Sequence, residues 1–306
     1  AAPFIAEKKD GRPVVLVCAD ETEAARLSED LHALTGEEVL RLSAREFTFH
    51  DAAAASRQWE HRRLAVFRAM QAGRAPLVAA TVDALLQRTL PPEVLERTAL
   101  TLRVGEVRDL PALTEVLSAA GYARCQQVEG TGQFALRGGI LDFFSPACDR
   151  PVRCEFFGDE IDSMGLFDPD TQRRTENLQE VQVLPVAEVL PQWAPGGLSG
   201  LLEALDGLME RVRTAKHPSQ ELLSTLSSDR ERLEHGAGFP AADRYLALIY
   251  PQMATAADYL PADAVVCLSE SPRVAERARN YLWRLEEDGK TLLESGLLAG
   301  EALTFA

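Results

Sequence analysis

The chain has 306 residues, of which 46% are hydrophobic and 26% are charged, as in soluble globular proteins with one large domain or several smaller ones. Acidic residues outnumber basic ones by 47 to 32, which gives a net charge of −15. Because Lys and Arg provide most of the affinity for nucleic-acid phosphates, this balance argues against DNA as the main ligand. We expect a cytoplasmic protein without a membrane partner, since no apolar run reaches the length of a membrane span and no signal peptide is present.

The five cysteines are odd in number and widely spaced, and no two form a C-x-x-C pair: Cys18, Cys125, Cys148, Cys154 and Cys267. This pattern predicts reduced thiols, mostly buried in strands, and agrees with a cytoplasmic location. The abrupt start at AAPFIAEKKDG predicts that the chain is a fragment of a longer protein.

The first part of the chain alternates apolar runs with helical patterns. Strands are predicted at 13–19, 39–42, 76–81 and 99–104, and helices at 20–34, 59–70, 82–87 and 110–120. Asp20 is the predicted N-cap of the first helix, and Glu23 completes the spacing of a capping box. Continuous apolar strands separated by helices predict an α/β layer around a parallel sheet.

After Gly121 the pattern changes to short strands separated by Gly, Pro and Asp turns, which continue to about Leu190. A Pro- and Gly-rich linker is predicted at 191–200, followed by helix over 201–234 with a break at 216–218, a strand at 264–268 and a helix at 271–287. We expect the late strand to return to the first sheet, which makes the β-rich part an insertion. The predicted divisions are 1–105, 106–190 and 191–306, and the loop at 48–56 is left unassigned.

The strand predicted at 151–157 alternates in a distinctive way. Val152, Cys154 and Phe156 share one face, whereas Arg153, Glu155 and Phe157 share the other. Arginine beside an aromatic residue on a rigid strand suits protein recognition. The alternative is an ordinary solvated face with Phe157 covered by a loop, and the residues alone favour that alternative.

Motifs for catalysis, metals and nucleotides are weak or missing. The VVLVCADE run ending at Glu21 has no phosphate-binding loop before it, so Asp20 is better explained as a helix cap. The G-K-T at 289–291 follows an acidic helix end instead of a strand, and the G-x-G at 130–132 leads into a strand instead of a helix. The histidines show no metal-binding spacing, and no nucleophile elbow is present. We expect no active site, cofactor or metal.

Two blocks of the central segment resemble a known family. They are R-G-G-I-L-D-F-F at 137–144 and E-F-F-G-D-E-I-D-S at 155–163, and weaker similarity extends along nearly the whole chain. They resemble the UvrB-homology region at the N-terminus of the bacterial transcription-repair coupling factor, Mfd. UvrB itself is the nearest competitor, but it carries a P-loop and a long aromatic hairpin that clamps DNA, and this chain has neither.

The resemblance implies a degenerate RecA- or helicase-like parallel-sheet domain with an inserted smaller α+β domain. It implies a non-catalytic adaptor that recruits UvrA in transcription-coupled nucleotide excision repair. RNA polymerase and DNA would be contacted only through further domains, among them an ATP-dependent translocase, that this chain lacks. The remaining alternative is a UvrB-like repair protein that retains nucleotide or DNA binding.

The family's UvrA contacts fall on Arg137, Arg153, Glu155 and Phe157 of this sequence. This agreement favours the recognition hypothesis over the solvated face. We expect the two arginines to contact acidic groups of UvrA, with Phe157 packed between them. We also expect Arg153→Ala and Phe157→Ala to leave thermal stability nearly unchanged.

Overall fold

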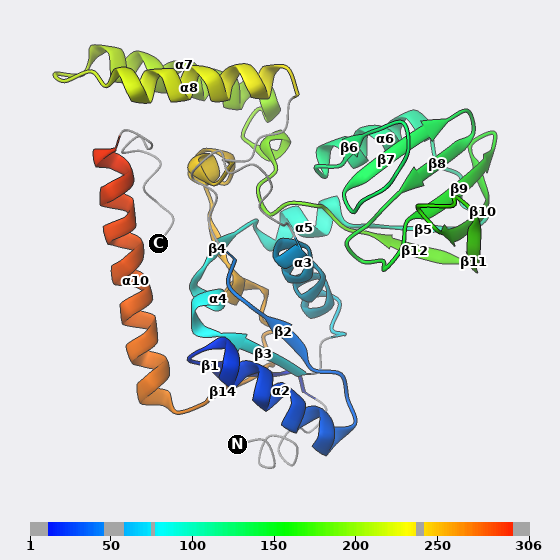
Figure 1. Ribbon diagram of the computed structural model, residues 1–306, viewed down its shortest axis with the longest axis horizontal. Coiled ribbons are helices and arrows are strands. Elements are labelled where there is room, and N and C mark those ends of the chain that lie inside the picture. The colour runs from blue at the N-terminus through cyan, green and yellow to red at the C-terminus, as the bar shows by residue number, and fades with distance from the viewer. Residues whose placement is uncertain (1–11, 46–57, 75–76, 237–241, 296–306) are drawn as a thin grey trace. The chain divides into compact units, whose positions relative to one another are not determined.

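The computed structural model describes residues 12–45, 58–74, 77–236 and 242–295, coloured in Figure 1. The chain forms two compact units. One contains Ala1–Trp59, Ala69–Pro91 and Pro191–Ala306, and the other contains Glu60–Arg68 and Pro92–Leu190. The chain therefore leaves the first unit and later returns to it. The mixed α/β class predicted from the sequence is confirmed.

The first unit is built on a four-stranded sheet with the order β14-β1-β3-β2. Its strands are β1 (Val14–Cys18), β2 (Leu40–Leu42), β3 (Leu77–Thr81) and β14 (Val265–Leu268), and every neighbouring pair is parallel. All residues of β1 and β3 are buried, because both faces of these central strands carry apolar side chains. The pairing of β14 with β1 confirms that the late strand returns to the first sheet.

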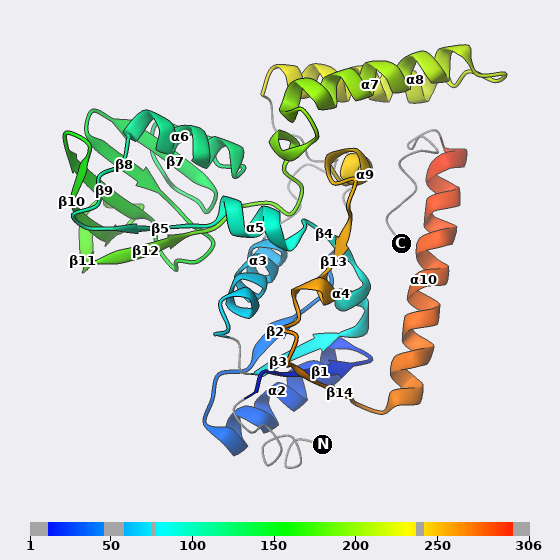
Figure 2. The same ribbon diagram turned by 180° about the vertical axis from the view of Figure 1, so that it is seen from behind.

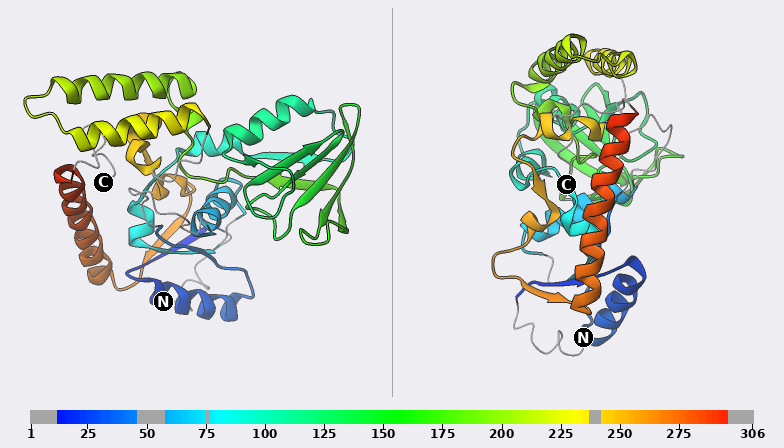
Figure 3. Two further views of the ribbon diagram at one scale, coloured as in Figure 1. Left: turned by 45° about the horizontal axis from the view of Figure 1, so that its top comes forward. Right: turned by 90° about the vertical axis from the view of Figure 1, so that its left-hand side faces the viewer.

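Helices make up most of the rest of this unit. They are α2 (Glu21–Thr35), α4 (Val82–Leu86), α7 (Gly197–Thr214), α8 (Gln220–Glu234), α9 (Leu246–Ile249) and α10 (Ser271–Glu294), while α3 (Gln58–Gln71) contributes residues to both units. Figure 3 shows α7 and α8 lying side by side as a helical hairpin, whose turn falls at the break predicted for 216–218. The predicted linker instead holds a 3-10 turn (Pro191–Trp193) and the start of α7. The unassigned loop at 48–56 lies outside the described residues. A two-stranded pair joins β4 (Arg88–Thr89) to β13 (Ala254–Thr255).

The turn between β1 and α2 is held by two carboxylates. The Asp20 side chain accepts a hydrogen bond from the Glu23 backbone N–H at 2.8 Å, so the predicted N-cap is confirmed. Glu23 does not complete the capping box. Its buried carboxylate accepts from the Ala19 backbone N–H at 3.1 Å and from the Ser269 hydroxyl at 2.7 Å. The difference arises because β14, distant in sequence, brings Ser269 beside this turn.

The second unit is built on a six-stranded sheet with the order β11-β10-β9-β8-β7-β6. Its strands are β6 (Ala123–Arg124), β7 (Gln133–Arg137), β8 (Ile140–Phe143), β9 (Val152–Phe157), β10 (Glu160–Phe167) and β11 (Arg174–Leu178). Only β6 and β7 pair in parallel; the other neighbours are antiparallel. One face of this sheet packs against α6 (Leu110–Ala119) in a continuous hydrophobic core.

A smaller antiparallel pair, β5 (Leu100–Arg103) and β12 (Glu180–Val183), also contributes to this core and lies with the six strands in Figure 2. The prediction that residues 99–104 join the parallel sheet of the first unit is wrong, because β5 pairs with β12. An apolar run of four residues fits either sheet, and its partner β12 lies far along the chain. The short helix α5 (Pro92–Thr98) leads into β5.

Every helix in the part of the chain that the structure describes is too short or too polar to span a lipid bilayer.

Candidate protein-interaction site

The alternation predicted for β9 is present in the structure. Val152 and Cys154 are fully buried in the core, and Phe156 packs against it. Arg153, Glu155 and Phe157 project from the opposite face of the six-stranded sheet, which we call the outer face. Along this face the side-chain exposure rises from Arg153 to Phe157, so the strand runs from an anchored end to an open one.

Arg153 is held from several sides. Its Nε and Nη2 donate to the two carboxylate oxygens of Asp142 at 2.7 and 2.9 Å, and its Nη1 donates to the backbone oxygen of Gln172 at 3.2 Å. The guanidinium also stacks 4.6 Å from the centre of the buried Phe167 ring. The hydrogen bond to Asp142 raises the pKa of Arg153 above its usual value. With only 17% of its side chain exposed, Arg153 is largely a structural residue.

Asp142 on β8 also holds the second candidate arginine. Arg137 Nη2 donates to Asp142 Oδ2 at 2.6 Å, while 48% of the Arg137 side chain remains exposed. Asp142 is buried and lies directly opposite Arg153 in the β8–β9 register. One carboxylate therefore orients two guanidinium groups and neutralises only one of their two positive charges.

Asp142 was not among the predicted site residues, although the Gly138-Gly139 turn and the alternation along β8 indicate its position. A two-residue Gly138-Gly139 turn pairs Arg137 with Ile140, and the same register places Asp142 two residues further along β8. Alternation from Ile140 then puts Asp142 on the outer face, beside the arginines. What the residues alone could not supply was the register of β9 against β8.

Glu155 occupies the middle of the outer face. Its carboxylate accepts from the Ser163 hydroxyl at 3.2 Å and lies 3.7 Å from Arg174 Nη1. Arg174 passes over Gly165, where a side chain would overlap its guanidinium. Glu155 is thus partly engaged within the sheet, and 44% of its side chain remains exposed.

Phe157 is the open end of the strand, with 83% of its surface exposed. It precedes the turn at Gly158, whose φ of +63° suits glycine. The alternative hypothesis that a loop covers Phe157 is wrong. In this structure Phe157 does not separate the two arginines, since both bind Asp142 and Phe157 lies four residues beyond Arg153 on β9.

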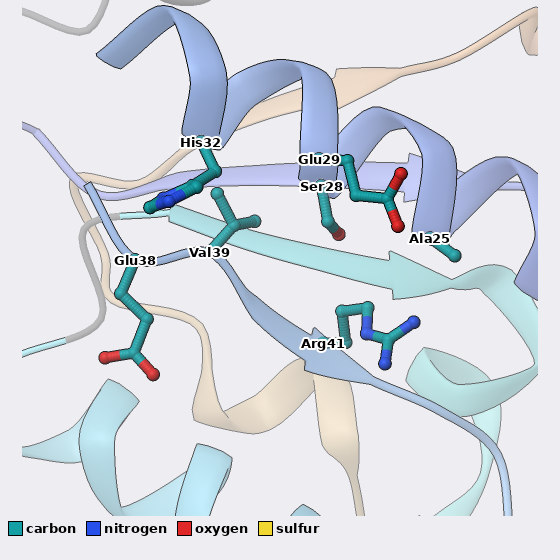
Figure 4. A pocket seen from close by; sticks show the side chains of 7 residues that line it. All are labelled: Ala25, Ser28, Glu29, His32, Glu38, Val39 and Arg41. Carbon is teal, nitrogen blue, oxygen red and sulfur yellow. The ribbon is translucent and has the colours of Figure 1, made fainter. Parts of the chain in front are cut away.

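Two other regions offer little chemistry. Among the described residues, no cluster of three or more His, Cys, Asp or Glu side chains is placed to hold a metal ion. A pocket of about 350 Å³ lies between α2 and the segment 38–41, and Figure 4 shows the side chains of Glu29, His32 and Arg41 around it. The turn between β1 and α2, where a nucleotide phosphate would bind in an NTPase of this topology, does not line this pocket.

Comparisons with known proteins match the second unit to a described domain family and most of the chain to longer proteins. Residues 100–188 match the family model of the UvrB interaction domain, and this range contains the whole outer face. The chain is 30% identical to the transcription-repair-coupling factor of Bacillus subtilis over 293 residues, which is 92% of this chain and 25% of that protein. It is 33% identical to the factor of Myxococcus xanthus over 284 residues, or 89% of this chain and 23% of that protein.

The factor of Escherichia coli is 33% identical over 184 residues, which is 60% of this chain and 16% of that protein. The second unit is therefore built around a UvrB interaction domain. Over most of its length the chain is similar to transcription-repair-coupling factors. It spans about a quarter of the length of the Bacillus and Myxococcus relatives.

Proposed function

We propose that this chain is a non-catalytic adaptor module that binds UvrA through the outer face and so recruits it during transcription-coupled nucleotide excision repair. The observation that carries this proposal is Phe157, a large aromatic side chain left exposed on the same face as two arginines. The match of residues 100–188 to the UvrB interaction domain supports the proposal that this face binds UvrA. The contact residues proposed are Arg137, Arg153, Glu155 and Phe157.

The contacts that these residues make within the free chain indicate a different role for each of them. Arg153 is fixed by Asp142, Gln172 and Phe167, so it shapes the surface more than it reaches outward. Arg137 donates a hydrogen bond to Asp142, and about half of its side chain is exposed, which suits a charge-assisted contact with an acidic group of UvrA. Phe157 provides the apolar anchor for a pocket on the partner, as aromatic residues do at the centres of interfaces.

Binding of the chain to immobilised UvrA tests this proposal. We expect Phe157→Ala and Arg137→Ala each to weaken binding by roughly tenfold or more, which corresponds to about 1.4 kcal/mol or more. Trp283→Ala is a matched control, because Trp283 is another exposed aromatic residue but lies on α10 in the first unit. Equal weakening by the control, or full binding by Phe157→Ala, would contradict the assignment of the site.

Arg153→Ala is a poor probe of binding alone. We now expect it to lower stability, contrary to the expectation from the sequence, because it leaves the buried Asp142 carboxylate with only the half-exposed Arg137. The unfolding midpoint of this variant must therefore be measured beside its UvrA affinity. Phe157→Ala is still expected to leave stability nearly unchanged, since its ring is mostly in solvent.

We propose no nucleotide turnover for this chain. A phosphate would bind at the N-terminus of α2, but two carboxylates already occupy this turn. Asp20 accepts a hydrogen bond from the backbone N–H of Glu23, and Glu23 accepts one from the backbone N–H of Ala19. A bound phosphate would be repelled by these charges. Titration with a fluorescent ATP analogue tests the UvrB-like alternative, and saturable micromolar binding would favour it.

The activities of the longer relatives lie outside this proposal for the chain itself. We propose that contacts with RNA polymerase and the translocation of DNA depend on other parts of such proteins. The cytoplasm is the proposed compartment, supported by cysteines that are all free thiols in the structure.

A further inference from the structure

The outer face continues past Phe157 through a segment with no regular strand of its own. Residues 105–108, between β5 and α6, run antiparallel to the start of β10. The backbone N–H of Gly105 donates to Ile161 O at 2.8 Å, that of Ile161 donates to Glu106 O at 2.9 Å, and that of Arg108 donates to Asp159 O at 2.7 Å. These three bonds fix the segment against the sheet.

The pairing places Phe157 and Val107 in one row. Phe157 pairs with Glu160 in the β9–β10 register, and Glu160 pairs with Val107 in an isolated antiparallel bridge. Residues directly opposite one another in antiparallel strands point to the same face, so all three project from the outer face. Two strand spacings separate Phe157 from Val107, or roughly 10 Å.

Both ends of this row are apolar and exposed. Val107 is 70% exposed, close to the 83% of Phe157, although both stand on backbone held by regular hydrogen bonds. Two large apolar side chains that are held in solvent on the same face are better explained as one docking surface than as two separately exposed residues. Glu160 between them is exposed, and its carboxylate makes no ion pair or hydrogen bond with any residue that the structure describes.

We propose that Phe157, Glu160 and Val107 form one docking strip, and that UvrA meets it with two apolar contacts on either side of a basic side chain. This inference rests on the proposed function and extends the contact surface to two residues outside the set assigned above. The positive group is required by charge complementarity, because a carboxylate covered by a partner without a cation would lose its hydration uncompensated.

The strip is tested with purified UvrA and the full 306-residue chain. Val107→Ser is expected to weaken binding by about fivefold. Glu160→Lys is expected to weaken it by about tenfold or more, because the new lysine would face the basic side chain of UvrA. Raising the salt concentration should reduce the effect of Glu160→Lys but leave that of Val107→Ser. Val116→Ser is the matched control, since Val116 is an exposed valine on α6, the helix that covers the opposite face of the same sheet.

Three outcomes are distinguishable. Weakening by both strip variants with unchanged binding of the control supports the strip. If Phe157→Ala weakens binding but Val107→Ser and Glu160→Lys bind like the unmodified chain, the strip is wrong while the proposed function stands. If the unmodified chain does not bind UvrA, the proposed function fails and the strip fails with it.

Discussion

At the scale of single residues, Asp142 changes how the candidate site is understood. Asp142 is buried on β8, directly opposite Arg153 in the β8–β9 register. Its carboxylate joins Arg153 on β9 to Arg137 on β7, so the two arginines share one buried partner. Their shared carboxylate could not be seen without the register between β8 and β9.

Removal of this carboxylate should be costly. Asp142→Ala leaves Arg153, which is largely buried, without its bidentate partner. We expect the free energy of unfolding to fall by about 3 kcal/mol. This value is at the lower end of the range for breaking a buried ion pair, because Arg153 keeps some access to water. Urea unfolding followed by circular dichroism measures this change.

Asp162→Ala provides the comparison for Asp142→Ala. Asp162 is an exposed carboxylate in the irregular stretch of β10 between Ile161 and Ser163. Its replacement should alter the free energy of unfolding by no more than about 0.5 kcal/mol. Similar losses from the two variants would mean that the buried pair contributes nothing specific.

At the scale of elements, local patterns identified most helices and strands, but not every partner. The long helices and the return of β14 were predicted, because helical periodicity and a buried apolar run are local signals. The placement of β5 failed, because its neighbour β12 is set by the tertiary fold. The role of Glu23 was missed for the same reason, as its partner Ser269 is brought in by β14.

The pairing of β10 with β11 depends on the absence of a side chain at Gly165. A Cβ there would overlap Arg174 Nε and the backbone oxygen of Glu176, and a backbone atom cannot move without disturbing the ladder. We expect Gly165→Ala to lower the free energy of unfolding by about 2 kcal/mol. Chemical denaturation is again the measurement.

Gly130→Ala is the matched control for Gly165→Ala. Gly130 has no positive φ, and its nearest neighbour would lie 4.0 Å from an added Cβ, so the substitution should be tolerated. A loss at Gly130 equal to that at Gly165 would show that crowding by Arg174 and Glu176 is not the cause.

At the scale of the whole molecule, the charge predicts weak interaction with DNA. A net charge of −15 opposes approach to a phosphate backbone. Fluorescence anisotropy with a labelled duplex at about 50 mM salt should show no saturable binding at micromolar protein concentrations. Salt-sensitive binding in this range would favour the DNA-binding alternative and would point to a local basic patch.

Buried thiols predict a loss of stability at alkaline pH. Burial raises the pKa of Cys18 and Cys154 to about 12 and that of Cys148 to about 11, from 9.0 for a free thiol. Above pH 9 the unfolded chain releases these protons while the folded chain retains them, so stability should be constant below pH 9 and fall as the pH rises towards 11. Each thiol should contribute about 1.4 kcal/mol per pH unit in this window.

The urea midpoint at pH 8 and at pH 10.5 measures this dependence. Tyr122 and Tyr245 act in the same direction at higher pH, because burial also raises their pKa values. Cys154→Ala separates the contributions, since it should reduce the drop between the two pH values and leave the remaining thiols titrating. A midpoint that is unchanged at pH 10.5 would contradict the prediction.

The return of β14 to the first sheet has a consequence for synthesis on the ribosome. β3 ends at Thr81 and β14 begins at Val265, so β1 emerges long before its second neighbour has been translated. At bacterial elongation rates of roughly 5–20 residues per second, this delay is on the order of ten seconds or more. The second unit has all of its strands within one continuous stretch and can close its sheet during that interval. Until β14 has been translated, the edge of β1 that will pair with it stays unpaired and is open to pairing with other chains.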